Sequence, residues 1–194
     1  MKDLTLSLVI AVTALAACNN EKTTNSENKK QQDSIVNASK STATGTADNT
    51  AASMKEMVGQ YLQIKNALAN DNGEEAATAG KAFVTSMGKM EKTTLSPEKL
   101  KIWEDLSDDA KEMAGHIGMN HGKIDHQREH FDMLSTDMYD MVKAFGTDQT
   151  LYMSYCPMFN NNKGASWLSE TKEIQNPYYG KKMLTCGSVK EEIK

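Results

Sequence analysis

The chain has 194 residues, of which 39% are hydrophobic and 25% are charged, and its formal net charge is -4. This length fits one domain with additional segments. An acidic chain in which Arg128 is the only arginine lacks the basic surface that nucleic acids require, so we exclude a nucleic-acid-binding protein. Only 6% of the residues are aromatic and 3 are proline, which disfavours an all-β sandwich with its many turns.

Residues 1–17 have the pattern of a lipoprotein signal peptide. Lys2 precedes an almost wholly apolar run over residues 4–17, which is too short to span a bilayer comfortably. The run ends in Leu-Ala-Ala-Cys at residues 15–18, which resembles the lipobox of bacterial lipoproteins, whose cysteine is acylated. We therefore expect a lipidated Cys18 that anchors the protein to a membrane of the Gram-negative cell envelope, facing the periplasm or the cell surface. The alternative is an ordinary secretory signal beside an incidental Cys18.

Residues 18–50 are expected to form a disordered tether that begins at the lipidated cysteine. The segment has no aromatic residue, its only large aliphatic residues are Ile35 and Val36, and its charges are balanced. Such a composition cannot bury enough apolar surface to offset the entropy lost on folding. The folded domain is therefore predicted to span residues 51–194.

Four stretches between residues 51 and 146 repeat apolar side chains with the period of a helix. Asp71 or Asn72 is suited to cap the second helix, Ser96 followed by Pro97 starts the third, and Gly146 ends the fourth. Three glycines predict a break between the last two helices near residues 118–123. We predict an all-α fold, a four-helix antiparallel up-down bundle. The expected helices cover about residues 54–68, 76–90, 97–117 and 124–145.

The segment after Gly146 is predicted to be irregular and rich in loops. Residues 151–155 are typical of a short strand, whereas residues 160–164 and Asn176-Pro177 are typical of turns. We expect this segment to lie along the bundle, with Arg128 joining the two, because a guanidinium in a helical seam needs carboxylate or carbonyl partners.

Two thiols and two thioethers form a candidate metal site in this segment. Cys156 and Met158 are two residues apart, and Met183 and Cys186 are three residues apart. Soft sulfur donors favour Cu(I) over hard cations. The alternative is a structural disulfide between Cys156 and Cys186, which would close a loop of about 30 residues and stabilise the fold by roughly 3–4 kcal/mol.

The same segment resembles a bacterial domain-of-unknown-function family that occurs as envelope lipoproteins and fused to CusB-type copper-efflux adaptor proteins. The resemblance covers most of residues 55–190, and it implies heavy-metal handling, chiefly of copper, at the four sulfurs. Members often carry histidine before Cys-Pro-Met, where this chain has Tyr155. The motifs that carry the resemblance are Tyr-Cys-Pro-Met at 155–158, Lys-Gly-Ala-Ser-Trp-Leu-Ser at 163–169, Glu-Ile-Gln-Asn-Pro-Tyr-Tyr-Gly at 173–180 and Met-Leu-Thr-Cys-Gly at 183–187, with Gln127-Arg128, Phe131 and Leu134-Ser135 upstream.

Three histidines form a second candidate metal site. His126 and His130 are four residues apart and share one helix face with Met133, whereas His116 lies on the preceding helix, near Met119. The alternative is that these are solvated histidines beside the core.

Residues 126–130 also match H-x-x-E-H, the inverted zincin pattern, in which Glu129 would activate water. We disfavour this enzyme interpretation because no third ligand or substrate cleft is identifiable from the sequence, and we expect no catalytic activity.

The sequence therefore predicts an envelope lipoprotein that binds soft metal ions, Cu(I) first among them, for copper or heavy-metal buffering or efflux. Its expected partners are the membrane, through the lipid, and a copper-efflux adaptor or another envelope metal-handling protein. The alternative is a helical interaction module that binds no metal and contains a structural Cys156–Cys186 disulfide.

Overall fold

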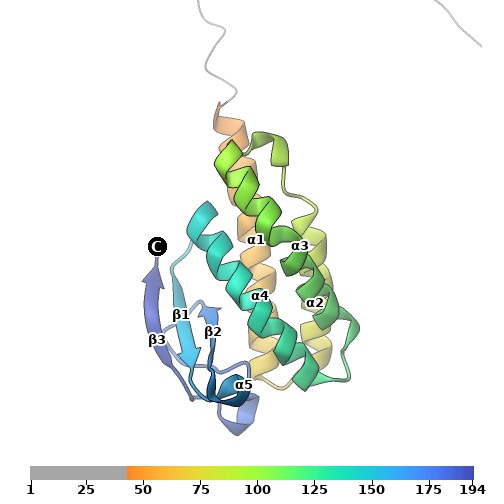
Figure 1. Ribbon diagram of the computed structural model, residues 1–194, viewed down its shortest axis with the longest axis vertical. Helices are drawn as coiled ribbons and strands as arrows, with labels where there is room; N and C mark the ends of the chain where they lie inside the picture. Colours follow the sequence, from red (N-terminus) through yellow and green to blue (C-terminus); the bar gives the residue numbers. More distant parts are fainter. Residues whose placement is uncertain (1–42) are drawn as a thin grey trace, which may run out of the picture. The chain divides into compact units, whose positions relative to one another are not determined.

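The computed structural model describes residues 43–194, which form four long helices and a small sheet (Figure 1). The predicted signal peptide, Cys18 and residues 18–42 of the predicted tether lie outside the described residues. Within the described part, no helix is long and apolar enough to cross a membrane. The mainly helical prediction is confirmed. The long helices are α1 (Ala43–Ala69), α2 (Gly73–Met87), α3 (Pro97–Met119) and α4 (Ile124–Phe145), with a 3-10 turn at Lys92–Thr94.

The helix boundaries follow local sequence signals, with one exception. The side chain of Asn72 accepts a hydrogen bond from the Glu75 amide (3.1 Å), and Ser96 caps α3 in the same way. The break between α3 and α4 lies where the glycines predicted it, and α4 ends before Gly146, which has a φ of +88°. The exception is α1, which begins at Ala43, so its first turns extend into the range predicted as tether.

The helices bury a common apolar core. Each helix contacts the next in the chain, and α4 also contacts α1. At the α2–α3 contact, a Cβ on Gly80 would lie 2.8 Å from the Ala114 carbonyl oxygen, so glycine allows the two backbones to approach closely. Core side chains with little or no exposure include Met57, Tyr61, Ile64, Leu68, Phe83, Trp103, Ile117, Phe131, Leu134 and Met138.

The C-terminal segment is an antiparallel sheet, which corrects the all-α prediction and the expectation of an irregular C-terminus. Strand β1 (Leu151–Cys156) lies between β2 (Ala165–Ser169) and β3 (Ser188–Ile193). The strand predicted at 151–155 is confirmed. The strands β2 and β3 were both missed, and β3 gives little signal because it is mostly polar and exposed, as expected for an edge strand. A short α5 (Phe159–Asn162) connects β1 to β2.

The sheet packs on the helices through β2, which contacts α4 and α1 beside it (Figure 1). Trp167 and Leu168 are buried there, and the Leu168 amide donates a hydrogen bond to the Tyr61 hydroxyl (3.0 Å). Just beyond β2, Glu170 forms an ion pair of 2.7 Å with Lys65 of α1, whose side chain is only 1% exposed. A buried ammonium needs such a partner.

Arg128 joins the helices to the C-terminal segment, as the sequence predicted. The buried guanidinium donates from Nε to the Pro177 carbonyl (2.9 Å) and from Nη2 to the Leu68 carbonyl (3.0 Å) and to Asp71 Oδ1 (2.6 Å). Gly180, with a φ of +55°, packs so closely against Asp71 and Arg128 that a Cβ would collide with both. We call these five residues the arginine clamp. It ties α4, the α1–α2 connection and the C-terminal segment together.

Candidate metal sites

The structure brings together three of the four predicted sulfur ligands, which we call the sulfur cluster: Cys156, Cys186 and Met158. Cys156 is the last residue of β1 and is buried, and Cys186 lies in the turn before β3. Both are free thiols, with their Sγ atoms 3.7 Å apart. The Cys186 thiol also lies 3.8 Å from Met158 Sδ. Residues 28 and 30 positions apart in the chain thus meet at one point.

Asn176, which is fully buried, holds the turn that carries Cys186. Its side-chain amide donates to the Cys186 carbonyl (2.7 Å), and its backbone amide donates to the Leu184 carbonyl (2.7 Å). Its Oδ1 accepts the Tyr178 and Tyr179 amides. Sequence reasoning recognised Asn176-Pro177 only as a turn. The Asn-Pro pair signals a turn, but nothing in the sequence indicates that the Asn176 side chain bonds to Cys186.

Gly187 allows this turn to approach the sheet. Its φ is +141°, and a Cβ there would lie 2.9 Å from Trp167 Cη2 and 3.0 Å from the Tyr155 carbonyl oxygen. A side chain at this position would push Cys186 away from Cys156. The glycine after the second cysteine is therefore part of the geometry of the sulfur cluster.

Met183, the fourth predicted ligand, lies in the same turn but is not joined to the thiols. The Cys186 amide donates to the Met183 carbonyl (3.0 Å). Within residues 43–194, no hydrogen bond connects the Met183 sulfur to either cysteine. Met183 is thus near the cluster along the chain, through its backbone contact with Cys186.

The environment of Cys186 favours the neutral thiol in the absence of a cation. Loss of solvation, followed by the adjacent Cys156 thiol, raises the pKa of Cys186. A soft cation between the two sulfurs would reverse this preference, since a coordinating thiol loses its proton. Two thiols and a thioether are therefore suited to bind a soft cation. They are equally close enough for oxidation to a disulfide after a small movement.

The second predicted site is also assembled, from α3 and α4, and we call it the histidine cluster. One nitrogen each of His116, His126 and His130 lies within 4.8 Å of the others. Nε2 of His126 and Nε2 of His130 are 3.1 Å apart, and the rings of His116 and His130 stack with centroids 4.4 Å apart. His121 lies outside this group of three.

The outer nitrogens of these rings have partners of their own. Glu129 Oε2 lies 3.2 Å from His126 Nδ1, and Met113 Sδ lies 3.3 Å from His130 Nδ1. Glu112 lies 3.6 Å from His116 Nε2. Sequence reasoning missed Met113 and considered Met119 and Met133 instead. Both of those are exposed, with 69% and 46% of their surface accessible.

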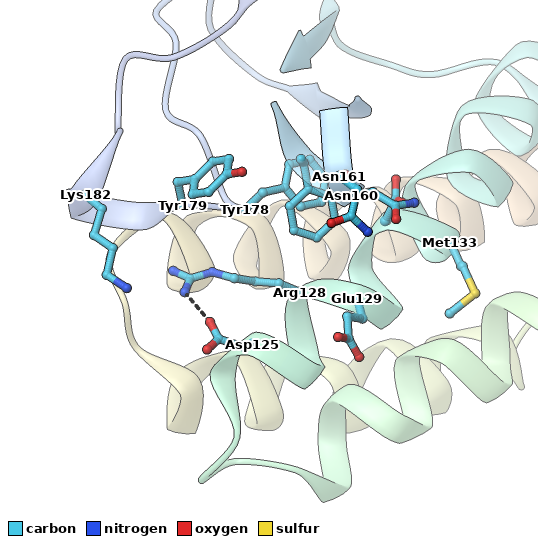
Figure 2. Close-up of a pocket in the computed structure, with 11 residues that line it drawn as sticks. Asp125, Arg128, Glu129, Met133, Asn160, Asn161, Tyr178, Tyr179 and Lys182 are labelled. Atoms are coloured by element: carbon cyan, nitrogen blue, oxygen red, sulfur yellow. Dashed lines mark hydrogen bonds and ion pairs between the residues drawn. The ribbon is translucent and has the colours of Figure 1, made fainter. Parts of the chain in front are cut away.

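A pocket of about 580 Å³ lies between α4 and the C-terminal segment (Figure 2). Arg128, Glu129 and Met133 line it from α4, and Tyr178 and Tyr179 line it from the C-terminal segment. Glu129 also contacts His126, and the Tyr179 hydroxyl donates to the Met158 carbonyl (2.9 Å). No cluster residue lines the pocket itself, but one lining residue contacts each cluster.

Comparison with protein families gives a match to the helical part of the chain. Residues 57–150 match the family described as "Protein of unknown function (DUF3347)". This supports the predicted domain-of-unknown-function family for the helical part of the chain, including the histidine cluster, and it ends before Cys156. Comparison with curated proteins and with solved structures gives no match.

Proposed function

We propose that this protein is a tethered lipoprotein of the cell envelope that binds Cu(I) at the sulfur cluster and buffers the ion or passes it to an efflux system. Cys156, Cys186 and Met158 are the ligands, with Met183 as a fourth. The observation that carries the proposal is the pair of free thiols 3.7 Å apart beside a thioether.

The geometry is suited to one ion. With metal–sulfur bonds of about 2.3 Å, two sulfurs 3.7 Å apart would bind one ion with a sulfur–metal–sulfur angle of roughly 110°. Such an angle leaves room for a third and a fourth ligand. Met158 is 42% exposed, so the cluster is open to an incoming ion on that side. Soft donors select Cu(I), and this accords with the copper-efflux association that the sequence resemblance implies.

The proposed role is binding rather than catalysis. The Glu129 carboxylate contacts the outer nitrogen of His126, which is an orienting position rather than one beside a metal-bound water. We further propose that the four helices form the predicted antiparallel up-down bundle, that Cys18 carries the lipid anchor, and that the partner is a copper-efflux adaptor or another envelope metal-handling protein.

The experiment is a Cu(I) titration of the reduced protein against a chromophoric chelator. We expect one equivalent bound at the sulfur cluster. Cys156→Ser and Cys186→Ser should each weaken binding by at least about 100-fold, because a charged ligand is lost, and Met158→Leu should weaken it less. Met119→Leu, which changes an exposed methionine remote from both cysteines in sequence, is the matched control and should leave the affinity unchanged.

The short distance between the Cys156 and Cys186 sulfurs also favours a second candidate function. Thiols 3.7 Å apart are close enough to form a disulfide, and the protein would then be a helical interaction module that binds no metal. A thiol count on the metal-free protein distinguishes the two. If the reduced protein competes for Cu(I) no better than the Cys156→Ser, Cys186→Ser double variant, the copper proposal is wrong and the module takes its place.

A further inference from the structure

We propose that the histidine cluster binds a divalent metal ion of the kind that prefers imidazole, Cu²⁺ or Zn²⁺, independently of the sulfur cluster. The ligands are His126 Nε2, His130 Nε2 and one ring nitrogen of His116. The site lies between α3 and α4, and its ligands come from helices rather than from the sheet.

The inner nitrogens are spaced as ligands. If two nitrogens 3.1 Å apart each lie about 2.05 Å from one ion, the nitrogen–metal–nitrogen angle is roughly 100°. His116 provides a third nitrogen, since one ring nitrogen of each histidine lies within 4.8 Å of the others. Its ring stacks on that of His130 with an interplanar angle of 7°, so His116 must turn out of this stack to point its lone pair at the same ion. Three imidazoles with an open fourth position form a common arrangement for Zn²⁺ and Cu²⁺ in proteins.

The outer contacts determine which nitrogens carry protons. A carboxylate and a thioether can only accept hydrogen bonds, so Glu129 and Met113 assign the protons of neutral His126 and His130 to Nδ1. The two Nε2 lone pairs then face each other at 3.1 Å and repel. A cation between them removes the repulsion. This is the arrangement in which outer partners orient metal-binding histidines.

The surroundings compensate the charge of a divalent ion. Three neutral imidazoles bring no charge, whereas the carboxylates of Glu112 and Glu129 lie just outside the ligand set. The side chains of His116 and His126 are 37% and 42% exposed, so an ion can enter from solvent. Imidazole is a harder donor than thiolate, so the two clusters should select different ions: Cu(I) at sulfur and a divalent ion at histidine.

One alternative fits the same distances, namely a proton shared between His126 and His130 in a hydrogen bond. In that case the three rings would form a structural cluster without affinity for metal. The two interpretations differ in the number of metal ions bound, one or none. They also differ in whether replacing His116 changes metal affinity, because a shared proton needs only two rings.

The test uses the full-length Cys156→Ser, Cys186→Ser double variant, in which the sulfur cluster cannot contribute thiolates. Calorimetric titration with Zn²⁺ and, separately, with Cu²⁺ should give one equivalent, with Cu²⁺ bound more tightly. Replacing His116, His126 or His130 by Ala should weaken binding by at least about 100-fold, and Glu129→Gln should weaken it by roughly 10-fold. His121→Ala is the matched control and should have no effect. The Cu²⁺ paramagnetic resonance spectrum should show coupling to imidazole nitrogens.

Thermal melts of the metal-free variants verify that each one folds, and His126→Gln provides a second variant if His126→Ala does not. The proposal is overturned if His116→Ala binds as tightly as the parent, if His121→Ala weakens binding equally, or if nitrogen coupling is absent. Because the titration uses a chain without the two thiols, its failure leaves the Cu(I) proposal intact, and the Cu(I) titration can fail without affecting this one.

Discussion

The sulfur cluster and the histidine cluster contrast in how the fold positions them. His126 and His130 are four residues apart on one helix, so the regular spacing of α4 alone places them side by side, and α3 adds His116. Cys156 and Cys186 are 30 residues apart, and they meet only when the sheet has formed and the turn after Asn176 has packed against it. The histidine cluster thus depends on helix packing, and the sulfur cluster depends on the docking of the sheet. Changes that loosen the sheet should affect the two sites unequally.

The largest effect is expected from Gly180→Val, which breaks the arginine clamp. Valine is strained at a φ of +55°, and its Cβ would collide with Asp71 and Arg128. Loss of the carboxylate partner of a buried guanidinium adds to the cost, and we expect roughly 4 kcal/mol less stability in a urea titration. Cu(I) affinity at the sulfur cluster should fall more than divalent affinity at the histidine cluster.

The matched control for this prediction is Gly59→Ala in α1, where a Cβ meets nothing within 4 Å. Alanine in the helix should raise stability by about 0.5–1 kcal/mol and leave both metal affinities unchanged. Equal losses at both clusters in Gly180→Val would contradict the idea that they depend on different parts of the fold.

The next largest loss of stability is expected from Glu170→Gln, which leaves Lys65 buried beside a neutral partner. Removing one member of a fully buried ion pair costs about 3 kcal/mol or more, but the Glu170 side chain is 35% exposed, so we expect a loss of about 2 kcal/mol, which chemical denaturation measures. Burial opposes ionisation of Glu170, but hydrogen bonds from Lys65 and Asn66 outweigh it and lower its pKa. A lowered pKa stabilises the fold above the ordinary carboxyl range, so the advantage of the wild type should shrink as the pH falls from that range through the lowered pKa of Glu170.

Replacing the lysine instead of the glutamate gives the control for this pair. Lys65→Met removes the charge that needs a partner while retaining an apolar stem, so its cost should be much smaller than that of Glu170→Gln. A larger loss in Lys65→Met would mean that the pair itself, rather than the unpaired ammonium, determines how the sheet docks on α1.

The smallest effect is expected in the helices, at Asp137 of α4. Burial, followed by repulsion from Asp109 and Asp140, raises the pKa of Asp137 to about 6. A raised carboxyl pKa disfavours the charged form in the folded state, so stability should fall as the pH rises from about 4 to above 6. Asp137→Asn should therefore be more stable than the wild type at pH 8 by roughly 1–2 kcal/mol, and equal to it near pH 4.

Melting temperatures across this pH range measure the effect, and Asp109→Asn should give a smaller gain with the same sign because it removes one of the two repelling charges. Neither variant should alter Cu(I) binding, since both positions lie on helices. A stability gain that does not depend on pH would contradict the assigned cause.

The sequence was sufficient to predict features set by neighbouring residues, such as helix ends, and insufficient for contacts between distant segments. Asn72, Ser96-Pro97 and Gly146 marked helix ends because caps and glycine act within one turn of the chain. The strand β3 was missed because an exposed edge strand needs no apolar alternation. The spacing of His126 and His130 could be predicted from one helix. The approach of His116 from α3 to this pair on α4 could not be predicted, because no pattern in a single chain specifies which turns of two helices face each other.

The arginine clamp has a consequence for the order in which the chain folds. Arg128 bonds to residues 49 positions later and 60 positions earlier in the chain, and closing such separations costs entropy before any contact compensates for it. The helices, joined by short connections, should therefore associate first. The C-terminal segment should add in a later kinetic step that buries the guanidinium and brings Cys156 to Cys186. Copper binding during refolding would then report the completion of that last step.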